Sequence, residues 1–270
     1  MSTPALGPLI AKGRTAEVYA WQEGQILKLF YDWCPPPWIQ HEIDTSRVIT
    51  TKKLSTPKWI GTQEIENRRG IIYERVDGPS MLVVCSTKPW LIFRMARQMA
   101  ELHTQIHRQD GSGLASLRSS LQATIQRVEN LPPGLKNGVL RLLEKLPDES
   151  ALCHFDFHPG QVLITNKGPV IIDWMTACQG HPLADVARTA IILTTSPVPG
   201  ANWAMRAMVN LWRGLFYRGY LARYLELHPG VTRDEITTWM VPVAGGRLEE
   251  GIAGEQEPLL KFIEAHLFQQ

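Results

Sequence analysis

The spacing of hydrophobic residues changes between residues 78 and 88, from a pattern typical of strands to one typical of helices. Before this point, short β-rich runs at 17–21 and 25–30 flank Gln22-Glu23-Gly24, which is typical of a β-hairpin. After it, apolar residues recur every three or four positions over 89–108, which predicts an amphipathic helix. The pattern therefore predicts an α+β protein with a small strand-rich part followed by a larger helical part.

Further elements follow the same two periods. We expect a helix at 39–49 and a buried strand at 70–76, before Asp77-Gly78-Pro79 breaks the chain at a candidate hinge. In the helical part the expected helices cover residues 114–128, 134–146, 183–194, 202–225, 233–250 and 258–268.

Composition narrows the class of protein. The chain has 270 residues, of which 44% are hydrophobic and 20% charged, as in ordinary globular proteins. The net charge of +2 argues for no nucleic-acid partner, and no apolar run approaches the ~20 residues of a membrane helix. The four cysteines have neither a disulfide framework nor zinc spacing, and residues 1–9 lack a signal-peptide pattern. We therefore expect a cytoplasmic protein without a membrane partner.

Two acids and an amide are expected close together within residues 153–173. The apolar runs 161–165 and 169–173 flank Asn166-Lys167-Gly168, which predicts a β-hairpin with a short turn. Pairing around that turn places Gln161 nearly opposite Asp173, at the open end beside the loop that carries Asp156. These three oxygen-bearing side chains could converge on a metal that holds a phosphate.

These side chains admit two kinds of chemistry. In the first, Asp173 and the amide oxygen of Gln161 bind Mg²⁺ and nucleotide phosphates, while Asp156 accepts a proton from an attacking hydroxyl. In the second, His154, Asp156 and His158 form an H-x-D-x-H site for catalytic zinc or iron, as in a metallohydrolase. The remaining candidates His181, His228 and His266 sit in no matching pattern, which favours the first chemistry.

The strand-rich part contains a glycine and a lysine that suit phosphate binding. Gly13 lies in a turn before a strand, where backbone N–H groups could face phosphates, although a single glycine is also typical of an ordinary turn. Lys28 interrupts the apolar run 26–30, and such a lysine either has an anionic partner or lies on an edge strand. Glu42 on the helix that follows is the candidate partner.

The block HFDFHPGQ at residues 154–161, followed by IIDW at 171–174, resembles the catalytic and metal-binding segments of the aminoglycoside phosphotransferase-like kinases. The family pattern is HGDLHPGN and then IDW, at similar spacing. The resemblance extends in order to the Gly13 loop, to Lys28 with Glu42, and to segments 73–78 and 180–187. It implies a two-lobed protein-kinase-like fold, with a nucleotide-binding lobe over 1–78 and a helical lobe over 79–270 that carries the catalytic loop and acceptor site.

The resemblance also implies how a nucleotide is held. Lys28, positioned by Glu42, would contact the α- and β-phosphates of ATP, and the loop at Gly13 would cover the phosphates. Backbone groups near Glu74 and Val76 would meet the adenine.

For the reaction itself, the resemblance implies transfer of the γ-phosphoryl group to a hydroxyl of a small molecule, such as an aminoglycoside-like compound, an amino alcohol or a sugar. Asp156 would be the catalytic base, and Gln161 with Asp173 would hold Mg²⁺. His154, His158 and Asp185 would brace the catalytic segment.

One position departs from the family pattern. The family has Asn where this chain has Gln161, and the longer side chain moves the amide by about one bond, whereas Mg²⁺ demands ligand distances of about 2.0–2.1 Å. A nucleotide-binding pseudokinase without turnover is therefore the alternative, although Lys28, Glu42, Asp156 and Asp173 are all present.

A dense acidic run near the C-terminus bears on the acceptor. It consists of Glu249, Glu250, Glu255 and Glu257, with Arg247 beside it. Such a run on helices is usually a solvated face, but it could also contact a cationic acceptor.

Overall fold

The structure is a computed structural model that describes residues 6–197, 200 and 202–267. Its contacts divide the chain into two compact units, each considered by itself. The first unit comprises the chain up to Leu82 together with Gly160–Thr176, and the second comprises Val83–Pro159 together with the chain from Ala177 onward.

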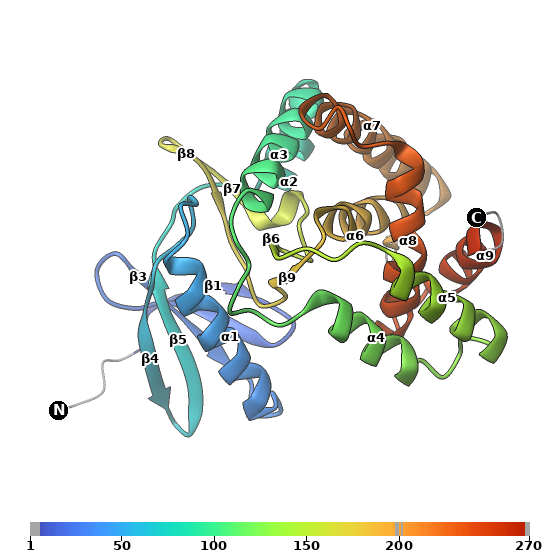
Figure 1. Cartoon of the computed structure of the whole chain (residues 1–270). Coiled ribbons are helices and arrows are strands. Elements are labelled where there is room, and N and C mark those ends of the chain that lie inside the picture. Colours follow the sequence, from blue (N-terminus) through green and yellow to red (C-terminus); the bar gives the residue numbers. More distant parts are fainter. Residues whose placement is uncertain (1–5, 198–199, 201, 268–270) are drawn as a thin grey trace. The chain divides into compact units, whose positions relative to one another are not determined.

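The first unit is built on a five-stranded antiparallel sheet with the strand order β1-β2-β3-β5-β4 (Figure 1). Its elements are β1 (Leu9–Lys12), β2 (Ala16–Ala20), β3 (Gln25–Phe30), α1 (Pro36–Thr50), β4 (Trp59–Ile65) and β5 (Arg68–Glu74). The central strand β3 is buried on both faces, since Leu27 and Leu29 pack on one side and Phe30 packs with α1 on the other. Because side chains alternate along a strand, Lys28 shares the face covered by α1.

Two of these strands were not expected from the sequence. All four residues of β1 are exposed, so no alternation toward a core marks it. Strand β4 joins β5 through Glu66-Asn67, whose φ values of 49° and 66° are both left-handed. A two-residue turn of this kind usually carries Asn-Gly or Asp-Gly. Without a glycine, this hairpin shows no strong turn signal.

A second hairpin, β7 (Val162–Thr165) with β8 (Gly168–Ile171), belongs to the first unit. The Ile164 N–H donates to the Pro79 carbonyl at 2.9 Å, and a Cβ on Gly78 would lie 2.5 Å from the Ile164 carbonyl oxygen. The boundary expected from the sequence, at residue 78, would place this hairpin in the helical part. The contact-based division differs because residues 77–79, expected to be a hinge, lie directly against β7.

The second unit is mainly helical. Its elements are α3 (Ile92–His107), α4 (Leu117–Arg127), α5 (Pro133–Lys145), β6 (Ala151–Cys153), β9 (Cys178–Gly180), α6 (Pro182–Thr195), α7 (Trp203–Leu227), α8 (Arg233–Arg247) and α9 (Gln256–Leu267). The unexpected short helix α2 (Met81–Thr87) lies where the two units join in the chain. The helices expected from the apolar period are present with shifted ends, and Phe268 lies outside the described residues.

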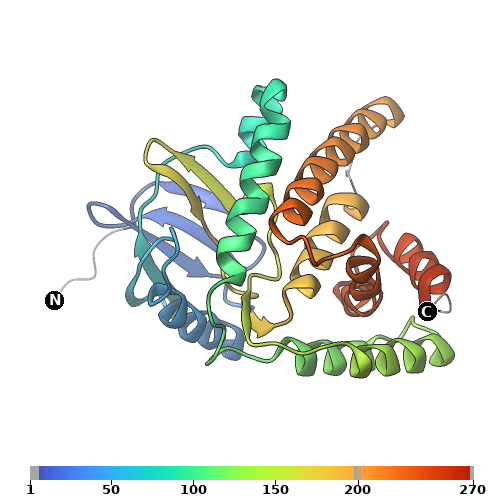
Figure 2. The same cartoon turned by 45° about the horizontal axis from the view of Figure 1, so that its top comes forward.

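Helices α3 and α7 lie side by side, and α6 packs against α7 and α8 (Figure 2). Ion pairs join Arg97 to Glu226 at 3.2 Å and Arg223 to Glu101 at 2.7 Å across the α3–α7 contact. Most of α6 is buried, including the polar residues Asp185, Arg188 and Thr189. Buried polar groups need hydrogen-bond partners, so we expect these three side chains of α6 to bond to neighbouring segments. Among the described residues, no helix is long and apolar enough to cross a membrane.

Candidate active site

Lys28 stands between two carboxylates in the first unit. Its Nζ lies 2.6 Å from Glu42 Oε1 and 3.2 Å from Asp173 Oδ1. The side chains of Lys28 and Glu42 are 16% and 3% exposed, whereas that of Asp173 is 42% exposed. The pairing with Glu42 agrees with the expectation from the sequence. The contact with Asp173 was not expected, because it joins residues 145 positions apart.

The two carboxylates fix the charge of the lysine. Burial lowers the pKa of Lys28, but the negative charges of Asp173 and Glu42 outweigh burial and hold this pKa well above its ordinary value. The ammonium is therefore charged at neutral pH, and it can contact an anion such as a phosphate.

Tyr73 on β5 supports the carboxylate of Glu42. The Tyr73 hydroxyl donates to Glu42 Oε1 at 3.2 Å and lies 2.7 Å from Ser46 Oγ on α1. Burial, followed by the charge of Glu42, raises the pKa of Tyr73, so the hydroxyl remains a neutral donor. No sequence pattern indicated this contact, which depends on the packing of β5 against α1.

Gln161 and Asp173 meet at the open end of the β7–β8 hairpin. The Ile172 N–H donates to the Gln161 carbonyl at 2.9 Å, and the Gln161 Nε2 donates to Asp173 Oδ2 at 3.4 Å. Asp173 has a φ of 60°, a left-handed conformation that Asp tolerates better than most residues. A half-turn of the Gln161 amide would bring its oxygen beside this carboxylate. Together these two side chains offer the oxygen ligands that suit Mg²⁺.

The remaining nucleotide-site candidates also lie in the first unit. Gly13 is exposed in the turn between β1 and β2, where its N–H donates to the Ala16 carbonyl at 2.8 Å. The Glu74 N–H donates to the Lys58 carbonyl at 2.9 Å, so it is occupied. In the described part of the chain, neither the N–H nor the carbonyl of Val76 has a backbone hydrogen-bond partner. Val76 therefore has backbone groups free of the sheet.

The segment before Asp156, in the second unit, is held through its backbone by α6. Asp185 accepts the N–H of His154 at Oδ2 (2.6 Å) and the N–H of Phe155 at Oδ1 (2.9 Å). Arg188 donates to the Phe155 carbonyl at 3.3 Å, one turn further along the helix. Phe155 has a φ of 60°, which is unusual for an aromatic residue and needs such support. These bonds fix the backbone that leads to Asp156.

The two histidines of the motif have different environments. His154 is fully buried, and its Nδ1 accepts the backbone N–H of Asp156 at 3.3 Å. His158 is partly exposed, with its Nε2 3.8 Å from Asp156 Oδ2. Among the described residues, His154, Asp156 and His158 do not form a group of converging metal ligands. The structure therefore does not bring together the three ligands that the metallohydrolase alternative needs.

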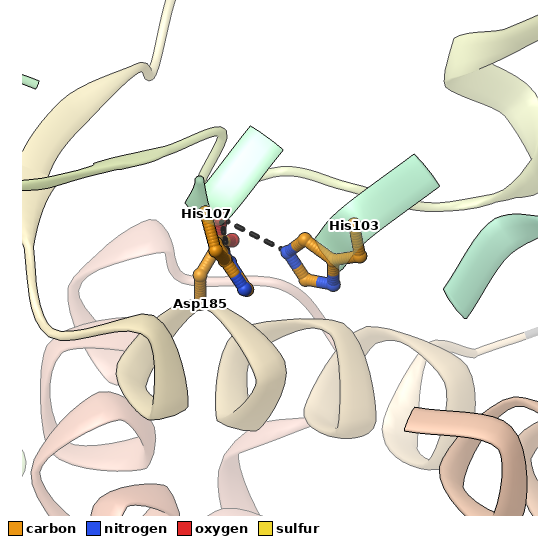
Figure 3. Close-up of side chains that lie close together, drawn as sticks. All are labelled: His103, His107 and Asp185. Carbon is orange, nitrogen blue, oxygen red and sulfur yellow. Dashed lines mark hydrogen bonds and ion pairs between the residues drawn. The ribbon is translucent and has the colours of Figure 1, made fainter. Parts of the chain in front are cut away.

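The structure does bring together another group that the sequence analysis missed. His103 and His107 on α3 lie 3.0 Å and 3.3 Å from Asp185 Oδ2 through their Nε2 atoms (Figure 3). Burial opposes ionisation of Asp185, but His103 and then His107 outweigh it and hold its pKa well below the usual range. The i, i+4 spacing of the two histidines on a predicted helix was the available signal.

The buried His107 predicts a specific dependence of stability on pH. Burial, followed by the charge of His103, lowers the pKa of His107 to about 4 from 6.5. Between these values the unfolded chain binds a proton that the folded chain does not, so the free energy of unfolding falls as the pH drops. We expect a loss of about 2 kcal/mol between pH 7.5 and pH 5.0, at ~1.4 kcal/mol per pKa unit.

Urea unfolding of the wild type and His107→Gln at the two pH values measures this contribution. The variant should lose less stability on acidification than the wild type. His181 and His228, whose pKa values burial also lowers, remain in both proteins and add to both slopes. Equal losses in the two proteins would contradict the prediction.

All four acids of the C-terminal acidic run are paired with basic side chains. Glu250 lies 2.5 Å from Arg188 and 2.6 Å from Arg247, which also binds Glu255 at 2.7 Å. The outer two acids form exposed pairs: Glu249 with Arg127 at 3.2 Å and Glu257 with Lys261 at 2.6 Å. Glu250 and Glu255 therefore belong to an internal ion-pair network, whereas Glu249 and Glu257 lie on the solvated face. Each acid of the run has a basic side chain that compensates its charge.

Comparison with known proteins identifies relatives of the sequence. A family model described as "Phosphotransferase enzyme family" matches residues 8–233. No curated protein matches the chain.

Solved structures with a similar fold include an amicoumacin kinase in complex with AMP-PNP, Ca²⁺ and Ami, at 15% identity and a TM-score of 0.60, covering 97% of this chain and 88% of that one. An aminoglycoside-3'-phosphotransferase of type VIII has 16% identity and a TM-score of 0.62, with 93% of each chain covered. A choline/ethanolamine kinase family protein from Mesorhizobium loti has 15% identity and a TM-score of 0.58, covering 97% of this chain and 88% of that chain. The α+β, protein-kinase-like fold expected from the sequence is confirmed.

Proposed function

The chain belongs to the phosphotransferase enzyme family, and we propose that it transfers the γ-phosphoryl group of ATP to a hydroxyl group of a small molecule. The observation that carries this proposal is the placement of Lys28 between Glu42 and Asp173. A charged lysine that is largely buried and fixed by two acids is ready to bind an anion, and one of those acids is exposed enough to bind a cation. Phosphotransfer needs both functions at one place.

The nucleotide side of the proposal uses residues of the first unit. Lys28 binds the α- and β-phosphates, while Glu42 keeps its ammonium in place through the 2.6 Å contact. Backbone N–H groups near Gly13 face the phosphates. The free backbone groups of Val76, with the carbonyl of Glu74, bind the adenine edge.

A divalent cation fits the oxygen donors of Asp173 and Gln161. When bound, Mg²⁺ would neutralise charge on the phosphates. Asp173 would hold the cation in place of its contact with Lys28, and Lys28 would then be available to the phosphates. The amicoumacin kinase complex with AMP-PNP and Ca²⁺ supports the combination of a nucleotide and a divalent cation in this fold.

The proposed reaction is a direct displacement at phosphorus. Asp156 orients the acceptor hydroxyl and takes its proton as the new oxygen–phosphorus bond forms. The bond between the γ-phosphorus and the bridging oxygen breaks, and ADP leaves with the electron pair. The contacts from Asp185 and Arg188 support this role, because they fix the backbone of the residue before Asp156.

The acceptor class is constrained by charge. An aminoglycoside is polycationic and needs uncompensated acids, whereas the acidic run at residues 249–257 is paired with arginine and lysine. We therefore place neutral or singly charged hydroxyl compounds, such as amino alcohols and sugars, ahead of aminoglycosides. Related structures include both aminoglycoside phosphotransferases and a choline/ethanolamine kinase family protein, so the panel of acceptors spans both kinds.

The test combines nucleotide binding with turnover. The wild type should gain thermal stability from ATP only when Mg²⁺ is present, and it should release ADP with at least one acceptor of the panel. Asp173→Ala should lose both effects. Asp44→Ala, the same change at an exposed acid of α1 paired with Arg47 at 3.6 Å, should lose neither.

The pseudokinase alternative predicts a different result. It requires a thermal shift with ATP but no phosphoryl transfer to any acceptor, and this outcome would overturn the proposed activity while leaving nucleotide binding intact.

Gln161 provides a separate prediction about the metal. Gln161→Ala removes one proposed oxygen ligand of Mg²⁺. We therefore expect the Mg²⁺ concentration needed for half-maximal turnover to rise by about tenfold or more, because the loss of a group that holds or supports a metal lowers the affinity on that scale. Gln161→Asn, which restores the family residue, should retain Mg²⁺-dependent turnover. A titration with Mg²⁺ at saturating ATP measures both. Unchanged Mg²⁺ dependence in Gln161→Ala would show that this side chain is not a ligand.

A further inference from the structure

Two histidine–tyrosine pairs converge on the buried carboxylate of Asp185. His103 Nδ1 lies 2.6 Å from the Tyr220 hydroxyl, and His107 Nδ1 lies 3.0 Å from the Tyr224 hydroxyl. On the opposite side of each ring, Nε2 faces Asp185 Oδ2 at 3.0 Å and 3.3 Å. His107 is therefore hydrogen-bonded on both sides of its ring, whereas His103 is hydrogen-bonded to Tyr220 and lies against Asp185 on its other side.

The two pairs repeat at the same interval on two helices. His103 and His107 are four residues apart on α3, and Tyr220 and Tyr224 are four apart on α7, so each pair occupies one turn of both helices. All four residues are buried, where a polar group without a partner is costly. The helices thus present two matched polar layers to a single carboxylate.

We propose that His103 and His107 are positioning residues for the catalytic segment, acting through Asp185, and that Tyr220 and Tyr224 fix the two imidazole rings. The inference rests on the proposed phosphotransfer, because it assigns the segment its reaction. It adds α3 and α7 to α6 as the helices that hold the backbone leading to Asp156.

The histidines act on the catalytic segment by holding the carboxyl group of Asp185 in one orientation. Asp185 Oδ2 accepts the N–H of His154 and also faces both imidazoles, while Oδ1 accepts the N–H of Phe155. If the imidazoles did not fix the carboxyl plane, it could rotate and release these N–H groups. Phe155 would then leave its left-handed conformation, and Asp156 would move with it.

A metal ion is the other occupant to consider for this cluster, since the three ligand atoms lie within 4.8 Å of one another. The backbone contacts favour the positioning role. Asp185 Oδ2 already accepts the His154 N–H at 2.6 Å, and a cation at this oxygen would compete with that donor. Within the described residues, His103 Nε2 has no partner with hydrogen-bond geometry, although it lies 3.0 Å from Asp185 Oδ2.

The test compares His103→Gln and Tyr220→Phe with the wild type. Tyr220→Phe removes a single hydroxyl and keeps the ring, so it tests the proposal even if His103→Gln folds poorly. His266→Gln is the matched control, because His266 lies on α9 and its Nδ1 is 2.9 Å from the Phe262 carbonyl, away from the cluster around Asp185.

Amide hydrogen exchange of His154 and Phe155 is the first measurement, and it does not depend on activity. Exchange at these amides should accelerate by about tenfold or more in both variants and remain unchanged in the control. The second measurement is ADP release, which should fall by about tenfold or more while the Kd of ATP changes less than twofold, since small misplacements of a catalytic group are costly.

Two outcomes overturn the proposal: unchanged exchange at both amides, or stoichiometric zinc or cobalt in the wild type that is lost in His103→Gln. A wild type without turnover for any acceptor would instead overturn the proposed function, while the exchange data would still decide whether the histidines hold the segment.

Discussion

Asp156→Asn should abolish acceptor-dependent ADP release, with a fall of about 10²–10⁴-fold in kcat, the range attributed to a positioned general base. The substitution keeps the size of the side chain and its capacity to orient a hydroxyl, but it removes the group that takes the proton. The Kd of ATP should change little, because the residues proposed to bind the nucleotide, such as Lys28 and Asp173, belong to the first unit.

Steady-state kinetics and calorimetric titration with ATP separate these two effects. Asp148→Asn is the control, since Asp148 is an exposed acid of the same unit that pairs with Arg118 at 2.9 Å. It should retain wild-type turnover. If Asp156→Asn kept more than a tenth of the wild-type kcat, another group would have to accept the proton, and the role of Asp156 would be limited to orientation.

Lys28→Met should destabilise the protein by about 3 kcal/mol, because it leaves the buried carboxylate of Glu42 without its cation. The Glu42 side chain is 3% exposed, so water cannot replace the ammonium, whereas Asp173 is 42% exposed and can be hydrated. The double variant Lys28→Met/Glu42→Leu should recover most of this loss, since replacing a buried ion pair by apolar groups is often nearly neutral. Both variants should lose ATP binding.

The sign of the pH dependence follows from the raised pKa of Lys28. The stabilising contribution is fully present below the ordinary lysine pKa of 10.5 and is lost only at more alkaline pH, so urea unfolding at neutral pH measures all of it. Lys12→Met is the control, because Lys12 is 64% exposed and its 3.3 Å pair with Glu17 should contribute no more than about 1 kcal/mol. Equal losses in Lys28→Met and Lys12→Met would contradict the assigned role of Glu42.

Contacts set by local chain geometry could be predicted from the sequence. The pairing of Gln161 with the end of β8 follows from the two-residue turn that precedes Gly168, whose φ of 119° requires glycine. The partner of Lys28 was also predictable, since a lysine on a buried strand needs an anion, and Glu42 lies on the next helix.

Contacts that depend on packing between distant segments could not be predicted. Nothing in the sequence near Asp173 indicates Lys28, and nothing near Asp185 indicates Tyr220 or Tyr224, because these contacts arise only when separate helices and strands meet. The histidines of α3 were not singled out from the sequence, although their i, i+4 spacing could have suggested a polar cluster. Strand β1 was missed because all of its residues are exposed.

The first unit is discontinuous along the chain, since it takes in Gly160–Thr176 after the polypeptide has already left it at Leu82. A gene fragment ending at Leu82 would therefore encode Lys28 and Glu42 without Asp173 or Gln161. Recombination between related genes could exchange this unit intact only by carrying both stretches together. Such an exchange would have to keep Lys28 together with Asp173, its acidic neighbour, although 145 positions separate them.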